Sequence, residues 1–132
     1  MSPSELRVNN LVRFVKEDKI SEIGHHNLGL LLSNPASNDF EPIPLTEEWL
    51  LKFGFEKERE GNVEVFWPVN TKIREVFYGQ LHPDFIIRVI EREDKSFGYF
   101  IDLDIVNKSI ESVHQLQNIY FALTGEELNI KL

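Results

Sequence analysis

The chain has 132 residues, of which 42% are hydrophobic, and it carries 22 acidic against 14 basic side chains, for a formal net charge of −8 at pH 7. This length and apolar content suffice for one folded domain and exclude an intrinsically disordered chain. The absence of cysteine excludes disulfides, thiolate catalysis and cysteine-based zinc sites, and it fits a reducing cytoplasm. The acidic balance argues against nonspecific nucleic-acid binding, which needs clustered cations.

The first 32 residues have the pattern of short strands. Apolar runs at residues 11–15, 20–23 and 28–32 are separated by a charged turn at residues 17–19 and by Gly24. They predict a small, curled antiparallel sheet, for which an SH3-like barrel is an alternative. Three short strands bury little apolar surface, so we expect this sheet to pack against later parts of the chain.

A change of composition follows at residues 33–44. Residues 33–40 have the composition of a loop, and Pro42 and Pro44 keep the next residues extended. We expect one compact domain over residues 1–132. The alternative is a subdivision into a short-strand region, 1–41, and a helix, meander and helix in 42–132.

A short helix is predicted at residues 46–53 because both of its ends carry local signals. Thr46 can cap the first turn, and Glu47 and Glu48 lie at the positive end of the helix dipole. Gly54 can adopt the left-handed conformation that ends a helix. So short a helix is stable only when it packs against the rest of the protein, and we expect its apolar side chains to make that contact.

The following fifty residues predict an antiparallel meander. Strands at residues 55–59 and 63–69 flank a predicted turn at 60–62, and a further strand covers 73–78. A long pair then joins residues 85–92 to residues 97–105 across a turn at 93–96. In the last strand, alternate residues from Phe97 to Ile105 form an apolar face, which needs a partner to cover it.

An amphipathic helix is predicted between Ser112, as its N-cap, and Gly125, as its stop. Its apolar stripe is expected to comprise Val113, Leu116, Ile119, Tyr120 and Leu123. We expect this stripe to pack on the face of residues 97–105. The predicted fold class is therefore α+β: an antiparallel meander with a C-terminal amphipathic helix packed on it, a short capped helix and N-terminal short strands.

The opposite side of the same helix is a candidate contact surface. It carries His114, Gln115 and Asn118, with Phe121 on the flank. The alternative is an ordinary solvated helix surface. The sequence contains no phosphate loop, dinucleotide fingerprint, nucleophile elbow or metalloprotease helix, so we predict no cofactor, no metal and no enzymatic activity.

Asp102 and Asp104 are a candidate pair of carboxylates at a spacing that suits chemistry. Residues two apart in a strand point to the same face, so the pair could hold Mg²⁺ in a hydrolase. The alternative is a solvated outer face, because the residues between them belong to the apolar face.

A small cationic cluster lies near Phe14 in the N-terminal strands. It contains Arg7, Arg13, Lys16 and Lys19, and it gives an alternative role in nucleic-acid binding. Glu5, Glu17 and Asp18 nearly cancel its charge.

Three segments carry a resemblance to a known family. They are ELRVNNLV at residues 5–12, PIPLTEEWLLKFGFEK at 42–57 and SVHQLQNIYFALTGEEL at 112–128. In order and spacing they resemble a family of small uncharacterised proteins from Bacteroidetes genomes and their phages or mobile elements. Asn9-Asn10 departs from the family, where glycine and asparagine are usual. The resemblance implies no activity, cofactor or catalytic residue.

The sequence thus favours a non-enzymatic protein-binding or adaptor module, serving a phage or mobile element. Its partner is expected to be another protein or a second copy of the chain. No apolar run approaches the roughly 18 residues that a membrane span needs, and the N-terminus lacks the apolar core of a signal peptide. We therefore expect a cytoplasmic protein.

Overall fold

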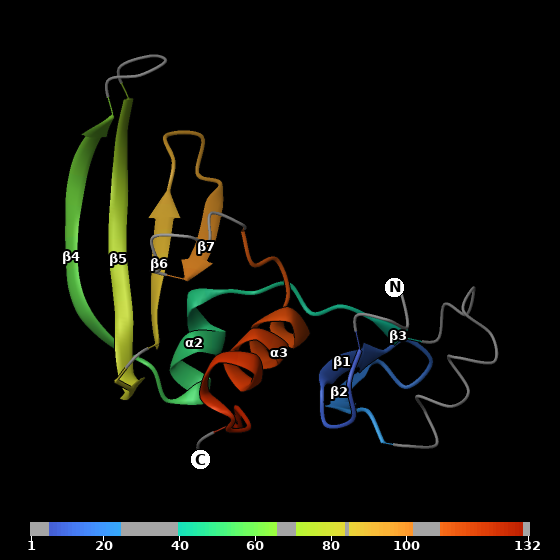
Figure 1. Cartoon of the computed structure of the whole chain (residues 1–132). Coiled ribbons are helices and arrows are strands. Elements are labelled where there is room, and N and C mark those ends of the chain that lie inside the picture. The colour runs from blue at the N-terminus through green and yellow to red at the C-terminus, as the bar shows by residue number, and fades with distance from the viewer. Residues whose placement is uncertain (1–5, 25–39, 66–70, 84, 102–108, 131–132) are drawn as a thin grey trace. The chain divides into compact units, whose positions relative to one another are not determined.

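A computed structural model describes residues 6–24, 40–65, 71–83, 85–101 and 109–130 (Figure 1). The chain is an α+β protein with antiparallel sheets, as predicted. It divides into two compact units: Met1–Leu45 with Ser112–Glu127, and Thr46–Glu111 with Leu128–Leu132. Most of the second unit, Thr46–Glu111, is therefore inserted into the first along the sequence.

The first unit contains a three-stranded antiparallel sheet with the strand order β2-β1-β3. Strand β1 is Leu11–Phe14, β2 is Lys19–Glu22 and β3 is Phe40–Glu41. The first two strands confirm the prediction. Phe40, which was expected to be in a loop, instead pairs with Phe14 in β1. The strand predicted at residues 28–32 lies outside the described residues.

This sheet has a small apolar core of its own. Leu6, Val12 and Ile23 are buried together, and Phe14 and Phe40 pack against them. The two phenylalanine rings meet edge to face, with their centroids 4.8 Å apart. Such aromatic pairs add about 0.5–1.5 kcal/mol beyond the burial of their area, so this contact favours the pairing of β3 with β1.

Helix α3, Val113–Thr124, belongs to the same unit and has the predicted ends. Ser112 is the N-cap, and its backbone N–H donates to Oε1 of Gln115 at 3.2 Å. Gly125 ends the helix with φ 75°, and its N–H donates to the carbonyl of Phe121 at 2.8 Å. Local capping chemistry thus accounts for both boundaries.

The buried face of α3 differs from the predicted stripe. Val113, Leu116 and Tyr120 are buried as expected, whereas Leu123 is 52% exposed. Two polar residues take part in the buried face instead, since His114 is 1% exposed and Gln117 is 3% exposed. The predicted stripe was therefore wrong at its C-terminal end.

Hydrogen bonds explain why Gln117 and Asn118 lie on the side of the helix that faces the rest of the first unit. Oε1 of Gln117 accepts from the backbone N–H of Leu11 at 2.7 Å. Oδ1 of Asn118 accepts from Nδ2 of Asn10 at 2.8 Å and from Nε of Arg7 at 3.1 Å. The C-terminal helix thus packs on a sheet, as predicted, but the sheet that it contacts through β1 and the turn before it is the three-stranded one. Of the face predicted as its partner, residues 102–105 lie outside the described residues.

The second unit begins with helix α2, Glu47–Phe53, whose predicted caps are confirmed. Oγ1 of Thr46 accepts from the N–H of Trp49 at 3.4 Å. Gly54 has φ 101°, and its N–H donates to the carbonyl of Leu51 at 3.0 Å. Trp49 and Phe53 are buried, as a helix of this length requires.

A four-stranded antiparallel sheet with the order β4-β5-β6-β7 follows, which confirms the predicted meander. Its strands are Glu56–Val65, Thr71–His82, Phe85–Glu91 and Phe97–Ile101. The turn predicted at residues 60–62 is wrong, because β4 continues through it and Gly61 pairs with Glu75. Pairing with the long strand β5 outweighs the local turn preference of Gly61 and Asn62.

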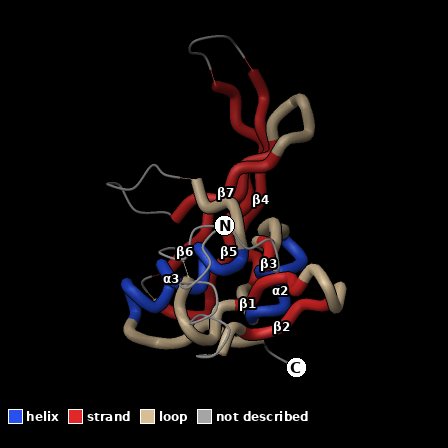
Figure 2. The backbone as a smooth tube through the Cα atoms, turned by 90° about the vertical axis from the view of Figure 1, so that its right-hand side faces the viewer, coloured by secondary structure: helices blue, strands red, loops and turns tan. Residues whose placement is uncertain are grey.

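The two faces of this sheet differ in burial. Val76, Tyr78, Ile87, Val89, Tyr99 and Ile101 form the buried face. In edge strand β4, every residue from Glu56 to Glu64 is exposed. The pairing of β5 with β6 ends at Arg74 and Glu91, whereas β4 and β5 stay paired up to Val65 and Thr71, so the two strands extend beyond β6 as a ribbon (Figure 2). Among the described residues, no helix is long and apolar enough to cross a membrane.

Substitution of Leu116 by alanine tests the observed face of α3. Leu116 is fully buried, so the change should lower the free energy of unfolding by about 2–5 kcal/mol. Leu123→Ala is the matched control on the same helix and should cost less than about 1 kcal/mol, because Leu123 is exposed. Urea denaturation measures both values, and equal losses would contradict this orientation of the helix.

Candidate functional site

A row of alternating arginine and phenylalanine crosses the outer face of the four-stranded sheet. Arg59 in β4 pairs with Phe77 in β5, which pairs with Arg88 in β6, which pairs with Phe100 in β7. Directly opposed residues of antiparallel strands point to the same side of a sheet. These four residues are called the arginine–phenylalanine ladder below.

Arg59 is held in place by the aromatic ring beside it. Its guanidinium carbon lies 4.0 Å from the centroid of the Phe77 ring. A cation–π contact at an exposed position contributes about 0.5–1 kcal/mol. Phe77 is only 9% exposed, so the guanidinium forms part of the surface that this position presents to solvent.

The second arginine is fixed by a carboxylate. Nε and Nη2 of Arg88 both lie 2.6 Å from Oε2 of Glu75, whose side chain is 18% exposed. A hydrogen-bonded ion pair of this kind defines the orientation of the guanidinium plane. The guanidinium of Arg88 is therefore held in one orientation, in the row between Phe77 and Phe100.

Gly98 allows the last part of the ladder to lie close to the sheet. A Cβ atom at this position would lie 2.7 Å from the ring of Phe100 and 3.0 Å from Nη2 of Arg92. Both distances are too short for a side chain to be accommodated without movement. The aromatic ring and the guanidinium of Arg92 thus lie over the glycine, and Arg92 is a third arginine next to the ladder.

A second polar arrangement centres on Arg74. Its Nε donates to Oε1 of Glu60 at 2.5 Å, and its Nη1 donates to Oε1 of Glu47 at 3.3 Å. The hydroxyl of Tyr78 donates to the other oxygen of Glu47. Burial, followed by the hydrogen bond to Glu47, raises the pKa of Tyr78 far above its usual value. These bonds tie the first turn of α2 to β5.

Two of the residues predicted as a contact surface have internal roles. His114 is buried, which contradicts its predicted place on the solvated side of the helix. Its Nδ1 lies 3.2 Å from Oγ of Ser112, so the hydroxyl gives the ring a polar neighbour inside the protein. Gln115 accepts from the backbone at the start of the helix.

The other two predicted contact residues lie next to Arg7. Asn118 accepts hydrogen bonds from Arg7 and Asn10. Phe121 is 40% exposed, and the guanidinium carbon of Arg7 lies 4.4 Å from its ring centroid. A contact surface on this helix stays a prediction, with Phe121 as its most exposed member.

The alternative sites are placed only in part. Asp102 and Asp104 lie outside the described residues, and the rest of the described chain contains no cluster of three His, Cys, Asp or Glu side chains that could hold a metal. In the basic cluster, Arg7 forms an ion pair with Glu127 at 2.5 Å, and Arg13 forms one with Glu41 at 2.5 Å. Nucleic-acid binding at these strands stays a prediction.

The ladder was missed by the sequence reasoning. The turn expected at residues 60–62 put Arg59 at the end of a strand opposite Val63, whereas the structure places it opposite Phe77. Alternation within residues 97–105 places Phe100 on the face opposite the apolar one, but it does not show which residue of the next strand lies beside it. Only the register joins Arg59, Phe77, Arg88 and Phe100 into one row.

Comparison with known proteins adds no relative. No family model matches the chain, and neither a curated protein nor a solved structure is significantly similar to it. The function is therefore inferred from the residues of the outer face and their geometry.

The raised pKa of Tyr78 gives a testable pH dependence. An unfolded tyrosine loses its proton near pH 10, whereas the folded chain keeps Tyr78 protonated to higher pH, so stability should fall as the pH rises above about 10. In Tyr78→Phe, this fall should be shallower by up to about 1.4 kcal/mol per pH unit. Denaturation at a series of pH values measures the slopes, and identical slopes in parent and variant would refute the assignment.

Proposed function

We propose that the chain is a non-enzymatic protein-binding or adaptor module, and that the arginine–phenylalanine ladder is its contact surface. One observation carries the proposal. Arg59, Phe77, Arg88 and Phe100 come from four different strands and lie in one row on the outer face of the sheet. Arginine and aromatic side chains are the types that protein interfaces concentrate and that contribute most binding energy.

The order already present in the ladder supports this role. Long side chains lose conformational freedom when a partner binds, at about 0.5–1.5 kcal/mol for each side chain. Arg59 is stacked on Phe77 and Arg88 is bonded to Glu75 in the free chain. Much of the conformational entropy of these two side chains is therefore lost on folding, so less of it opposes binding of a partner.

The charge of the chain bears on the partner. Two copies with a net charge of −8 each repel one another at long range, so association with a different protein is favoured over self-association. In the described residues, Arg59 has no carboxylate within ion-pair distance. The guanidinium of Arg59 can therefore donate two hydrogen bonds to a carboxylate of the partner.

The biological setting belongs to the same proposal. The resemblance of residues 5–12, 42–57 and 112–128 to proteins of Bacteroidetes phages and mobile elements supports an adaptor role in such an element. The lack of cysteine supports a cytoplasmic location. The genes next to the one encoding this chain would identify candidate partners.

Reversal of one ladder charge tests the contact surface. Arg59→Glu should lose at least about 90% of the protein captured by the parent chain, because a buried interface arginine typically contributes 1–2 kcal/mol or more. Lys57→Glu is the matched control: it makes the same charge change on the same strand, and its pairing with Tyr78 places it on the opposite face. Quantitative mass spectrometry of proteins captured from host and phage-infected cells gives the measurement.

The pattern across the two variants decides the outcome. A protein retained by Lys57→Glu and lost by Arg59→Glu would support the ladder. Equal capture by all three chains, or no specific capture at all, would refute it. Circular dichroism of both variants excludes a change of fold as the cause.

A further inference from the structure

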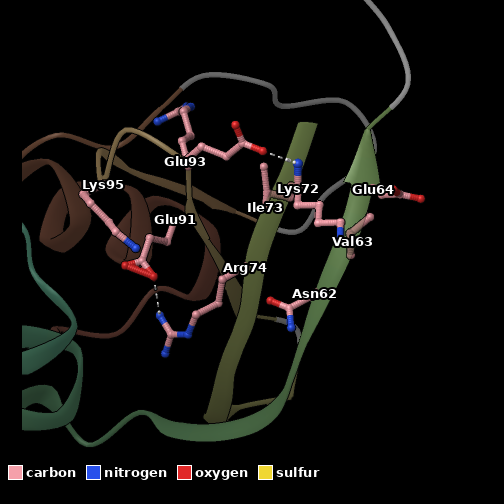
Figure 3. A pocket seen from close by; sticks show the side chains of 10 residues that line it. Asn62, Val63, Glu64, Lys72, Ile73, Arg74, Glu91, Glu93 and Lys95 are labelled. Carbon is pink, nitrogen blue, oxygen red and sulfur yellow. Dashed lines mark hydrogen bonds and ion pairs between the residues drawn. The ribbon is translucent and has the colours of Figure 1, made fainter. Parts of the chain in front are cut away.

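A polar hollow lies at the end of the same sheet where β4 and β5 extend beyond β6 (Figure 3). Its volume is about 790 Å³. Charged side chains of both signs line it, among them Glu64, Lys72, Arg74, Glu91, Glu93 and Lys95. None of the four ladder residues lines it, although the neighbouring Arg92 does, so the hollow is a second candidate surface for recognition.

Arg74 forms a fixed point of the hollow. Glu60 accepts from its Nε at 2.5 Å, Glu47 from its Nη1 at 3.3 Å, and Oε1 of Glu91 lies 3.9 Å from that same Nη1. The neighbouring Lys57 and Arg74 lower the pKa of Glu60. The guanidinium is thus held on several sides by carboxylates, and its charge is largely balanced within the chain.

Apart from Arg74 and Glu91, the charged side chains that line the hollow form no ion pair with one another in the described part of the chain. Glu64 and Lys72 are opposed residues of the ribbon, yet no ion pair joins them among the described interactions. Glu93 accepts from the backbone N–H of Lys72 at 3.0 Å (Figure 3), which leaves the ammonium of Lys72 out of that bond. Lys95, in the β6–β7 turn, has no carboxylate within ion-pair distance in the described residues.

We propose that this hollow binds a polypeptide segment that carries both acidic and basic side chains. Lys72 and Lys95 offer ammonium groups to carboxylates, and Glu64 and Glu93 offer carboxylates to lysine or arginine. Complementary charges of both signs fix the register of a bound segment and reject ligands with a single sign of charge. The proposal is independent of the ladder, because it concerns different residues and a different ligand contact.

The mixed charge favours a polypeptide over a nucleic acid. A phosphate backbone has one negative charge at every nucleotide, and it would meet the carboxylates of Glu64, Glu91 and Glu93 in the hollow. A purely lysine-rich segment would meet Lys72, Arg74 and Lys95 in the same way. A segment of both signs avoids each of these repulsions.

Titration of the full chain with defined probes tests the proposal. The probes are a short peptide of alternating glutamate and lysine, an oligoglutamate, an oligolysine and a single-stranded oligodeoxynucleotide, all at low salt. The alternating peptide should bind more tightly than the other three, and its amide shift changes should fall on residues that line the hollow. In Lys72→Glu/Lys95→Glu, its binding should weaken about tenfold, because each reversed charge replaces an attraction by a repulsion.

A matched control separates the hollow from net charge. Lys16→Glu/Lys19→Glu changes the charge by the same amount at exposed lysines outside the hollow, and it should leave the affinity within about twofold. The proposal is overturned if the alternating peptide does not bind, if any single-sign probe binds as tightly, or if both double variants weaken binding equally. None of these outcomes bears on capture through Arg59, so the two proposals fail separately.

Discussion

The first unit depends on hydrogen bonds that the side-chain amides of α3 form with residues far away in the sequence. Gln117 accepts from the N–H of Leu11, and Asn118 accepts from the side chain of Asn10, across separations of 106 and 108 residues. Closing loops of this length costs on the order of 4 kcal/mol in chain entropy. A typical hydrogen bond returns about 1 kcal/mol, so burial of Val12 and Leu116 must supply the rest. What the amides add is specificity, because Asn10 is 0% exposed and a shifted helix would leave its Nδ2 without the acceptor that Asn118 provides.

The same closure explains how one chain can hold an inserted unit. Pro44 and Ser112 form an isolated bridge, and the N–H of Val113 donates to the carbonyl of Ile43 at 2.9 Å. The segments that lead into and out of the second unit are therefore joined within the first unit. An insertion whose ends lie side by side is tolerated because it does not stretch the host fold. The ladder and the hollow both belong to the inserted unit, whereas the long-range amide contacts belong to the first.

Local chemistry decided which parts of the structure could be predicted from the sequence. Thr46, Gly54, Ser112 and Gly125 act on residues within one turn, so both helices were predicted with nearly the observed ends. The face of α3 was wrong in part, because the partners of Gln117 lie more than a hundred residues away and an amide counts as polar in any local pattern. The turn at residues 60–62 was wrong for a related reason, since strand pairing outweighed local propensity. The ladder requires the register of four strands, and no single strand contains that information.

The most direct test of this account is hydrogen exchange at the amide of Leu11. In the parent chain this amide should be protected, because it donates to Gln117. In Gln117→Met, which keeps the size of the side chain and removes the acceptor, exchange at Leu11 should become at least about tenfold faster, which is the effect of losing about 1.4 kcal/mol of protection. The amide of Ile23, which donates to Asn10 within the same unit, serves as the internal reference. Fast exchange at Leu11 in the parent chain, or equal acceleration at Leu11 and Ile23, would contradict the account.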